Sequence, residues 1–211
     1  EANKFSSAFT SKIVDALTVE EALQINVNDA PFTVSMRTPG DDISFVRGLL
    51  YSEDVISDIS FNPDISIKKE NKDGIVTVVN VTVPEEKLGL GYSNSRSLLS
   101  VSSCGVCGKT ELKDLDFQHK TIEDSNKISI ELIHQLFDKM NAAQHNFKQS
   151  GGTHAAAAFS IDGELLSTME DIGRHNALDK IIGHVKRRQL DTTDSAVLVT
   201  SRCSVELVQK T

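Results

Sequence analysis

The second half of the sequence alternates between helical and strand patterns. Ser129 precedes apolar residues at helical spacing, and two apolar runs then flank Asp162-Gly163, a pair that favours a two-residue hairpin turn. A second helical stripe, a short apolar run at residues 196–200 and a final helical pattern follow. This order predicts an α/β domain over residues 128–211. The first of these helices is predicted to carry an apolar stripe, at helical spacing, formed by Leu132, Ile133, Leu136, Phe137 and Met140.

The first half is richer in strand patterns. Alternating apolar residues on either side of Asn28 and Asp29 predict a β-hairpin, and a helix is expected to follow and to end near Ser52. Two more strands are expected, and the second, at residues 75–83, is apolar on both faces, which favours a central position. We therefore expect a smaller N-terminal α+β part.

Two boundaries follow from these patterns. The N-terminal part is predicted to span residues 1–100, and a mobile loop with a linker is predicted at residues 101–127. The last stretch, residues 204–211, has the pattern of a helix that is cut short, so we expect a C-terminally incomplete domain that belongs to a longer chain.

The charge balance restricts the classes of partner. The 211 residues include 22 Lys and Arg against 30 Asp and Glu, a net charge of −8. A general nucleic-acid binder or a binder of anionic membranes needs the opposite sign, so neither is expected. No apolar run approaches the roughly 20 residues that span a bilayer, and no signal peptide precedes the first strands, so we expect a cytoplasmic protein.

The cysteines give the strongest chemical signal. Three cysteines without a secretory segment favour a reducing compartment over a disulfide scaffold. Cys104 and Cys107 form a CxxC pair with a glycine after each, and Lys109 would favour a thiolate, the attacking form in sulfur transfer and redox chemistry. Half of a zinc site is the alternative, although the second pair of ligands is missing. Cys203 is expected to pack as a small apolar residue.

Three polar turns are candidate binding sites. The first has paired glycines that let a flat or phosphorylated ligand approach the backbone, and the second lies where a helix begins, which favours an anion. The third follows a short strand and would suit a phosphate. A packed turn, an N-cap with a surface ion pair and a plain serine N-cap are the respective alternatives. The candidate residues are Gly151, Gly152, Thr153 and His154; Gly173, Arg174, His175 and Asn176; and Ser201, Arg202 and Ser204.

One further contact is predicted within the second turn. His175 and Asp179 are one helical turn apart, so the carboxylate is expected to orient the imidazole.

Five ordered motifs carry a resemblance over nearly the whole chain: FTVSMRTPGDD, SSCGVCGK, GGTHAAAAF, EDIGRHNALDKIIG and TSRCSVELVQK. Together they resemble the formate dehydrogenase accessory sulfurtransferase (FdhD) family. The resemblance implies a cytidine deaminase-like α/β core with a smaller N-terminal α+β part, and a homodimer. Deaminase chemistry is excluded, because Ala156 stands where the H-x-E signature needs a glutamate.

The resemblance also implies an activity. A sulfurtransferase of this kind takes persulfide sulfur from a cysteine desulfurase and transfers it to the molybdenum or tungsten bis(guanine dinucleotide) pterin cofactor that formate dehydrogenase needs. Cys104 and Cys107 match the reactive pair, with Cys104 as the persulfide carrier, and the three polar turns match segments around the guanine nucleotide ends.

The implied partners are the desulfurase and the catalytic subunit of formate dehydrogenase. The molybdenum cofactor is expected as a bound substrate, with no tightly bound metal of the chain's own. The family usually continues beyond Thr211, and Thr200-Ser201-Arg202 stands where many members have Ser-Gly-Arg. A cofactor-binding chaperone without catalysis and a zinc-binding structural module are the alternatives.

Overall fold

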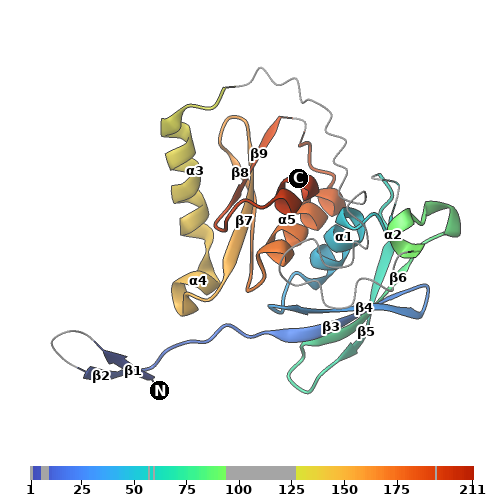
Figure 1. The fold of residues 1–211 in the computed structure, drawn as a ribbon, viewed down its shortest axis with the longest axis horizontal. Coiled ribbons are helices and arrows are strands. Elements are labelled where there is room, and N and C mark those ends of the chain that lie inside the picture. Colours follow the sequence, from blue (N-terminus) through green and yellow to red (C-terminus); the bar gives the residue numbers. More distant parts are fainter. Residues whose placement is uncertain (1, 6–9, 57, 59, 94–126, 193) are drawn as a thin grey trace.

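The computed structural model describes residues 2–5, 10–56, 58, 60–93, 127–192 and 194–211 (Figure 1). Cys104, Cys107 and all but the last residue of the predicted linker lie outside the described residues. Within the described part, no helix is both long enough and apolar enough to span a bilayer. The elements form a mixed α/β fold, which confirms the predicted fold class.

The N-terminal part is built on a mixed four-stranded sheet in the order β4-β3-β6-β5. The predicted hairpin is confirmed: Asn28 and Asp29 both have positive φ angles, 52° and 63°, as a type I′ turn requires. The expected central strand also lies inside the sheet, where it pairs in parallel with β3 and antiparallel with β5. The elements are β3 (Glu21–Val27), β4 (Ala30–Arg37), α1 (Asp42–Ser52), β5 (Asp64–Glu70) and β6 (Val76–Thr82).

Short elements flank this sheet. A separate strand pair, β1 (Ala2–Phe5) with β2 (Thr10–Ile13), precedes it. A 3-10 turn, η1 (Glu85–Lys87), and a single helical turn, α2 (Leu90–Ser93), follow it.

The C-terminal part is built on a second sheet, in the order β8-β7-β9, with both pairings antiparallel. Helix α5 covers the face that carries Ala156 and Ala158, and α3 covers the face that carries Ala155, Ala157 and Phe159 (Figure 1). The small alanines let both helices approach the sheet closely. The elements are α3 (Ile130–Ala143), α4 (His145–Ser150), β7 (His154–Ser160), β8 (Leu165–Asp171), α5 (Arg174–Arg188), β9 (Ser195–Val199) and α6 (Val205–Lys210).

The apolar stripe predicted on α3 is only partly buried. Leu136 and Met140 lie in the core, whereas Ile133 and Phe137 keep 40% and 39% of their surface exposed. The predicted stripe therefore packs on the sheet only in part, because the sheet contacts a narrower face of the helix than the sequence pattern offers. The start of the helix is as predicted, since the Ser129 hydroxyl accepts a hydrogen bond from the Leu132 amide at 3.1 Å.

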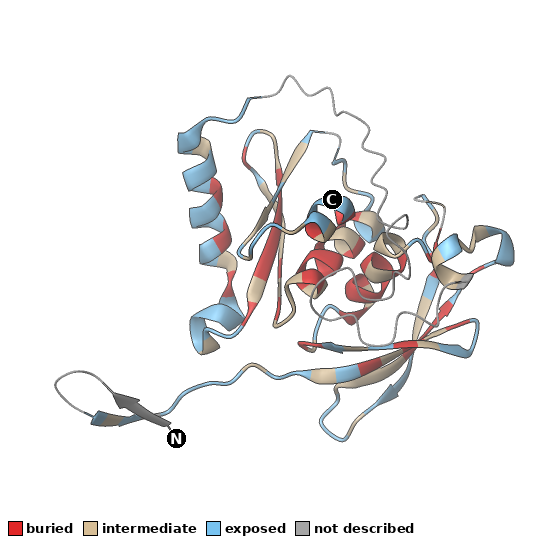
Figure 2. Ribbon diagram, in the orientation of Figure 1, coloured by how far each residue is buried: buried red, intermediate tan, exposed pale blue. Residues whose placement is uncertain are grey.

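A close crossing of α1 and α5 joins the two parts, and Figure 2 shows buried residues concentrated at these helices and in the sheets. Two glycines make the crossing possible. A Cβ at Gly48 would lie 1.8 Å from the carbonyl oxygen of Asp179, and one at Gly183 would lie 1.7 Å from that of Ser44. Both contacts are with backbone, so neither helix accepts a larger residue without moving away. The division into parts at residues 100 and 127 stays a prediction.

Candidate functional site

Two of the three predicted binding turns lie at one end of the C-terminal sheet. His154, the first residue of β7, is paired with Asp171, the last residue of β8. The glycine turn therefore ends beside the point where the chain leaves β8 and enters α5. Two pockets open here, and each is lined by one of the two turns.

The first pocket, called here the glycine-turn pocket, has a volume of about 470 Å³. All four residues of the predicted GGTH turn line it, together with side chains from α3 and α4 that the sequence analysis did not identify. None of the lining residues is a lysine, arginine, aspartate or glutamate, so the pocket offers backbone groups, polar side chains, the imidazole of His154 and the ring of Phe147. The lining residues are Asn141, Gln144, Phe147, Gly151, Gly152, Thr153, His154 and Thr200.

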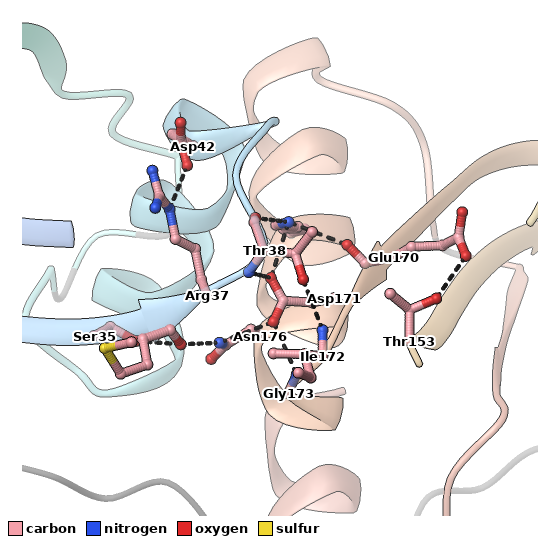
Figure 3. Close-up of polar contacts among 12 residues, drawn as sticks. Ser35, Arg37, Thr38, Asp42, Thr153, Glu170, Asp171, Ile172, Gly173 and Asn176 are labelled. Atoms are coloured by element: carbon pink, nitrogen blue, oxygen red, sulfur yellow. Dashed lines mark hydrogen bonds and ion pairs between the residues drawn. The ribbon is translucent and has the colours of Figure 1, made fainter. Parts of the chain in front are cut away.

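Glu170 holds this pocket in shape. Its carboxylate accepts a hydrogen bond from the Thr153 hydroxyl at 2.8 Å (Figure 3). It also accepts from the backbone amides of Asn146 and Phe147, at 2.8 and 2.7 Å. One side chain of β8 thus fixes both the glycine turn and the start of α4. No role of Glu170 was predicted from the sequence. Its position at the start of the polar EDIGRHN segment was the sequence feature that could have indicated a role.

Asp171 occupies the start of α5. Its fully buried carboxylate accepts from the Gly173 amide at 2.9 Å and from the Asn176 side chain at 3.1 Å, and on its other oxygen from the Thr38 amide at 3.0 Å (Figure 3). The positive end of the helix therefore already faces a carboxylate of the chain itself. The predicted role of Gly173, Arg174, His175 and Asn176 in binding an anion stays a prediction.

The second pocket, called here the β4-edge pocket, has a volume of about 480 Å³ and lies between β4, α1, α5 and α6. Gly173, His175 and Asn176 of the predicted site line it. Its other lining residues are Glu20, Phe32, Thr33, Val34, Ser35, Met36, Leu49, Glu53, Val55, Ile172, Asp179, Glu206 and Lys210.

Buried ion pairs bring α6 against this pocket. His175 Nε2 lies 2.8 Å from Glu206 Oε2, and this hydrogen bond lowers the pKa of the Glu206 carboxyl below its ordinary value. Lys210 Nζ lies 3.0 Å from Asp179 Oδ2 and 3.1 Å from Glu53 Oε1. Burial alone would lower the pKa of Lys210, but the two carboxylates raise it to about 12.

The predicted contact between His175 and Asp179 was wrong. The Asp179 carboxylate accepts from Ser52 at 2.8 Å and from Lys210 instead, while the imidazole pairs with Glu206. Residues from α1 and α6 reach this part of α5, and a pattern confined to α5 cannot reveal them.

The third predicted turn is not brought together with the other two. Ser201, Arg202 and Ser204 line neither pocket, and only their neighbour Thr200 reaches the glycine-turn pocket. The Ser204 hydroxyl accepts from the Leu207 amide at 3.4 Å, so this residue is the N-cap of α6. Cys203 is exposed, so the expectation that it packs was wrong. The turn between β9 and α6 lies outside the packed layers, where a small residue is not covered.

Comparisons with known proteins identify the family to which this chain is similar. Residues 18–211 match the FdhD/NarQ family. A relative from Sulfolobus acidocaldarius is 35% identical over 99% of this chain and 77% of its own length, and one from Thermoplasma acidophilum is 39% identical over 93% and 70%. A third, from Corynebacterium efficiens, is 38% identical over 97% and 77%. All three carry the name sulfur carrier protein FdhD.

A solved structure has the same fold. It is a crystal structure assigned as a formate dehydrogenase accessory protein from Desulfotalea psychrophila, with a TM-score of 0.69 over 99% of this chain and 76% of that one. At 18% identity this match speaks for the fold alone. The match over residues 18–211 and the identity to the three relatives decide the family: this chain belongs to the FdhD/NarQ family.

Proposed function

We propose that this chain is a sulfur carrier that accepts sulfane sulfur from a cysteine desulfurase and passes it to the molybdenum or tungsten bis(guanine dinucleotide) pterin cofactor of formate dehydrogenase. The observation that carries the proposal is the identity of 35–39% to relatives named sulfur carrier protein FdhD. The CxxC pair at Cys104 and Cys107 supplies the chemistry that such a carrier needs.

The proposed first step is a thiol–persulfide exchange at Cys104. The Cys104 thiolate attacks the outer sulfur of the persulfide on the desulfurase, a new S–S bond forms, and the desulfurase cysteine leaves as a thiolate. The sulfane sulfur then resides on Cys104, with Cys107 close enough in sequence to assist the next transfer. Lys109 favours the thiolate form electrostatically.

The lining of the glycine-turn pocket supports the proposal that the cofactor binds as a substrate. The glycine-turn pocket combines the exposed backbone of Gly151 and Gly152, the amide side chain of Gln144 and the ring of Phe147. Such a set suits a flat heterocycle with polar edges, because the ring offers a stacking surface and the amides offer donors and acceptors. We propose the residues of the three polar turns as the cofactor-binding residues, with Arg202 and Ser204 at the periphery.

The proposal includes the partners and setting of a sulfur carrier. The donor is a cysteine desulfurase and the acceptor is cofactor bound for the catalytic subunit of formate dehydrogenase. We further propose that the chain works as a homodimer in the cytoplasm.

A maturation assay separates this function from a cofactor chaperone without catalysis. Formate dehydrogenase would be matured with the wild-type chain and with the Cys104→Ala/Cys107→Ala variant, and binding of guanine nucleotides would be measured on both. We expect the variant to bind nucleotide normally and to yield inactive enzyme. Active enzyme from the variant would overturn the sulfur-carrier role in favour of the chaperone.

Zinc analysis addresses the remaining alternative. A structural module would contain one zinc per chain and would unfold when a chelator removes it. A sulfur carrier keeps its circular dichroism spectrum in the chelator, because its fold does not depend on the metal.

A further inference from the structure

We propose that the edge of β4 that no described strand pairs with, together with the acidic side of the β4-edge pocket, binds an extended basic peptide segment of a partner protein. This docking site goes beyond the sulfur-carrier function and does not rest on it, but it competes with the cofactor-binding role proposed above for Gly173, His175 and Asn176, which line the same pocket. The inference follows from three features: an open strand edge, a pocket that runs along it, and a surplus of carboxylates.

The first feature is the strand edge itself. β4 is the terminal strand of its sheet, and β3 is its partner among the described strands. Such an edge presents backbone N–H and C=O groups that another extended segment can pair with. The Met36 carbonyl already accepts a hydrogen bond from the Asn176 side chain at 2.8 Å (Figure 3). Because the outward-facing groups recur every second residue, those of Val34 also face away from β3.

The second feature is the course of the pocket. All five consecutive residues from Phe32 to Met36 line it, although successive side chains of a strand point to opposite faces. A pocket on one face would touch alternate residues, so this one lies along the edge. Five residues of strand span about 13 Å, enough for a peptide segment of similar length. Val34 and Met36 are also about half exposed, at 46% and 49%.

The third feature is the charge. Four carboxyl groups line the pocket, from Glu20, Glu53, Asp179 and Glu206, against one lysine and one histidine. Asp179 is almost completely buried, which raises its pKa, and it is paired with Lys210, so the charge that an occupant meets comes from the three glutamates. Lys210 is shared between two of these carboxylates. The pocket is therefore acidic even when the histidine is protonated. The lining of the glycine-turn pocket contains no aspartate, glutamate or lysine, so of these two pockets the β4-edge pocket is the acidic one.

The charge also decides the class of occupant. Carboxylates repel phosphate groups and attract lysine and arginine, and the strand edge adds backbone pairing that a nucleotide cannot use. A basic segment in extended conformation can pair with the backbone of the strand edge and with the carboxylates of the pocket at the same time. Because Gly173, His175 and Asn176 line the same pocket, a nucleotide is the competing occupant that the test must exclude.

The test uses a fluorescein-labelled peptide, acetyl-Lys-Val-Arg-Val-Lys-amide, and fluorescence anisotropy with the whole chain. Two control peptides separate the contribution of backbone pairing from that of charge. The peptide with both valines replaced by proline keeps the charge and loses backbone donors, and the peptide with glutamate at the three basic positions keeps the backbone and reverses the charge. We expect binding of the parent below about 1 mM, and binding at least about fivefold weaker for either control.

Two protein variants test the site on the chain's own side. Val34→Pro removes an outward N–H, which an edge strand tolerates, and Glu20→Lys reverses one exposed charge of the pocket. Each should weaken binding of the parent peptide about fivefold. Glu131→Lys, an exposed charge reversal on α3, is the matched control and should leave binding unchanged. If Val34→Pro fails to fold by circular dichroism, Glu20→Lys and the control peptides still decide.

Three results would overturn the proposal. The first is absence of binding by the parent peptide below about 1 mM, and the second is equal binding of the proline peptide. The third is competitive displacement by guanosine diphosphate, which would make the pocket a nucleotide site. A change of oligomeric state in Val34→Pro, together with absent peptide binding, would identify the edge as an interface between two copies of this chain.

Discussion

Lys180 and Asp171 form an ion pair of 2.9 Å between Nζ and Oδ2, with both side chains almost completely buried. Lys180 also donates to the backbone carbonyls of Thr38 at 2.9 Å and Glu170 at 3.1 Å. One lysine thus connects α5, the end of β8 and the segment after β4. The arrangement fixes the loop where the two pockets meet.

We predict that Lys180→Met lowers the free energy of unfolding by about 3–5 kcal/mol, because it leaves the Asp171 carboxylate buried without its partner. Urea denaturation followed by circular dichroism measures the change. The exposed pair of Lys68 with Asp29, at 4.0 Å, provides the control, since Lys68→Met should cost less than about 0.5 kcal/mol. Equal losses of unfolding free energy in the two variants would show that the buried pair of Lys180 and Asp171 stabilises the chain no more than the exposed pair does.

The crossing of α1 and α5 gives a second prediction. Gly48→Ala and Gly183→Ala should each destabilise the chain by about 3 kcal/mol or more, because the added methyl group meets backbone rather than a movable side chain. Thermal and urea unfolding measure the loss. Gln135→Ala, on the exposed face of α3, should be neutral. A small effect of both glycine variants would mean that the helices separate easily.

The pair of His175 and Glu206 gives a prediction on pH. The hydrogen bond from His175 lowers the pKa of Glu206 below its ordinary value of 4.5. While His175 is protonated, the contribution of this pair to stability is therefore present above that value and is lost as the pH falls through the lowered pKa of Glu206. Glu206→Gln should cost about 1 kcal/mol at pH 6, because the pair is mostly buried but still partly screened by solvent, and much less in strong acid.

Urea unfolding at several pH values from 6 downward measures this difference. Glu131→Gln, at an exposed position of α3, is the control and should cost little at every pH. A loss in Glu206→Gln that does not change with pH would contradict the assignment to an ion pair.

Glu170 gives a fourth prediction. Glu170→Ala frees the amides of Asn146 and Phe147 and the hydroxyl of Thr153, so hydrogen exchange at the start of α4 should accelerate, with a loss of stability of about 1 kcal/mol. Glu164→Ala, at an exposed position near the hairpin turn, should leave the exchange of α4 unchanged. Unchanged exchange in both variants would remove Glu170 as the support of the glycine-turn pocket.

Local chemistry explains which parts of the fold could be predicted from the sequence. The hairpins at Asn28-Asp29 and Asp162-Gly163 were predictable, because those residues favour the positive φ angles that tight turns need. The cap at Ser129 was predictable for a similar local reason. By contrast, the parallel pairing of β3 with β6 depends on contacts between residues about 54 positions apart.

In the candidate site, too, local features were predictable and contacts between distant segments were not. The glycine turn and the start of α5 were found because their residue types are unusual within a few positions. Glu206 and Glu170 were missed, since each acts on a segment that lies elsewhere in the sequence: Glu206 on His175, and Glu170 on the start of α4. The predicted contact between His175 and Asp179 was wrong for the same reason, because the partners of both side chains lie in α1 and α6.

The central claim is that Cys104 carries the transferred sulfur. The most direct measurement is the intact mass of the chain after incubation with a cysteine desulfurase and cysteine, for the wild type, Cys104→Ala, Cys107→Ala and Cys203→Ala. Cys203 is exposed, so its variant is the matched control for a reactive surface thiol. We expect the mass of one added sulfur atom in the wild type and in Cys203→Ala, and its loss in Cys104→Ala. An adduct that persists in Cys104→Ala and disappears in Cys203→Ala would contradict it.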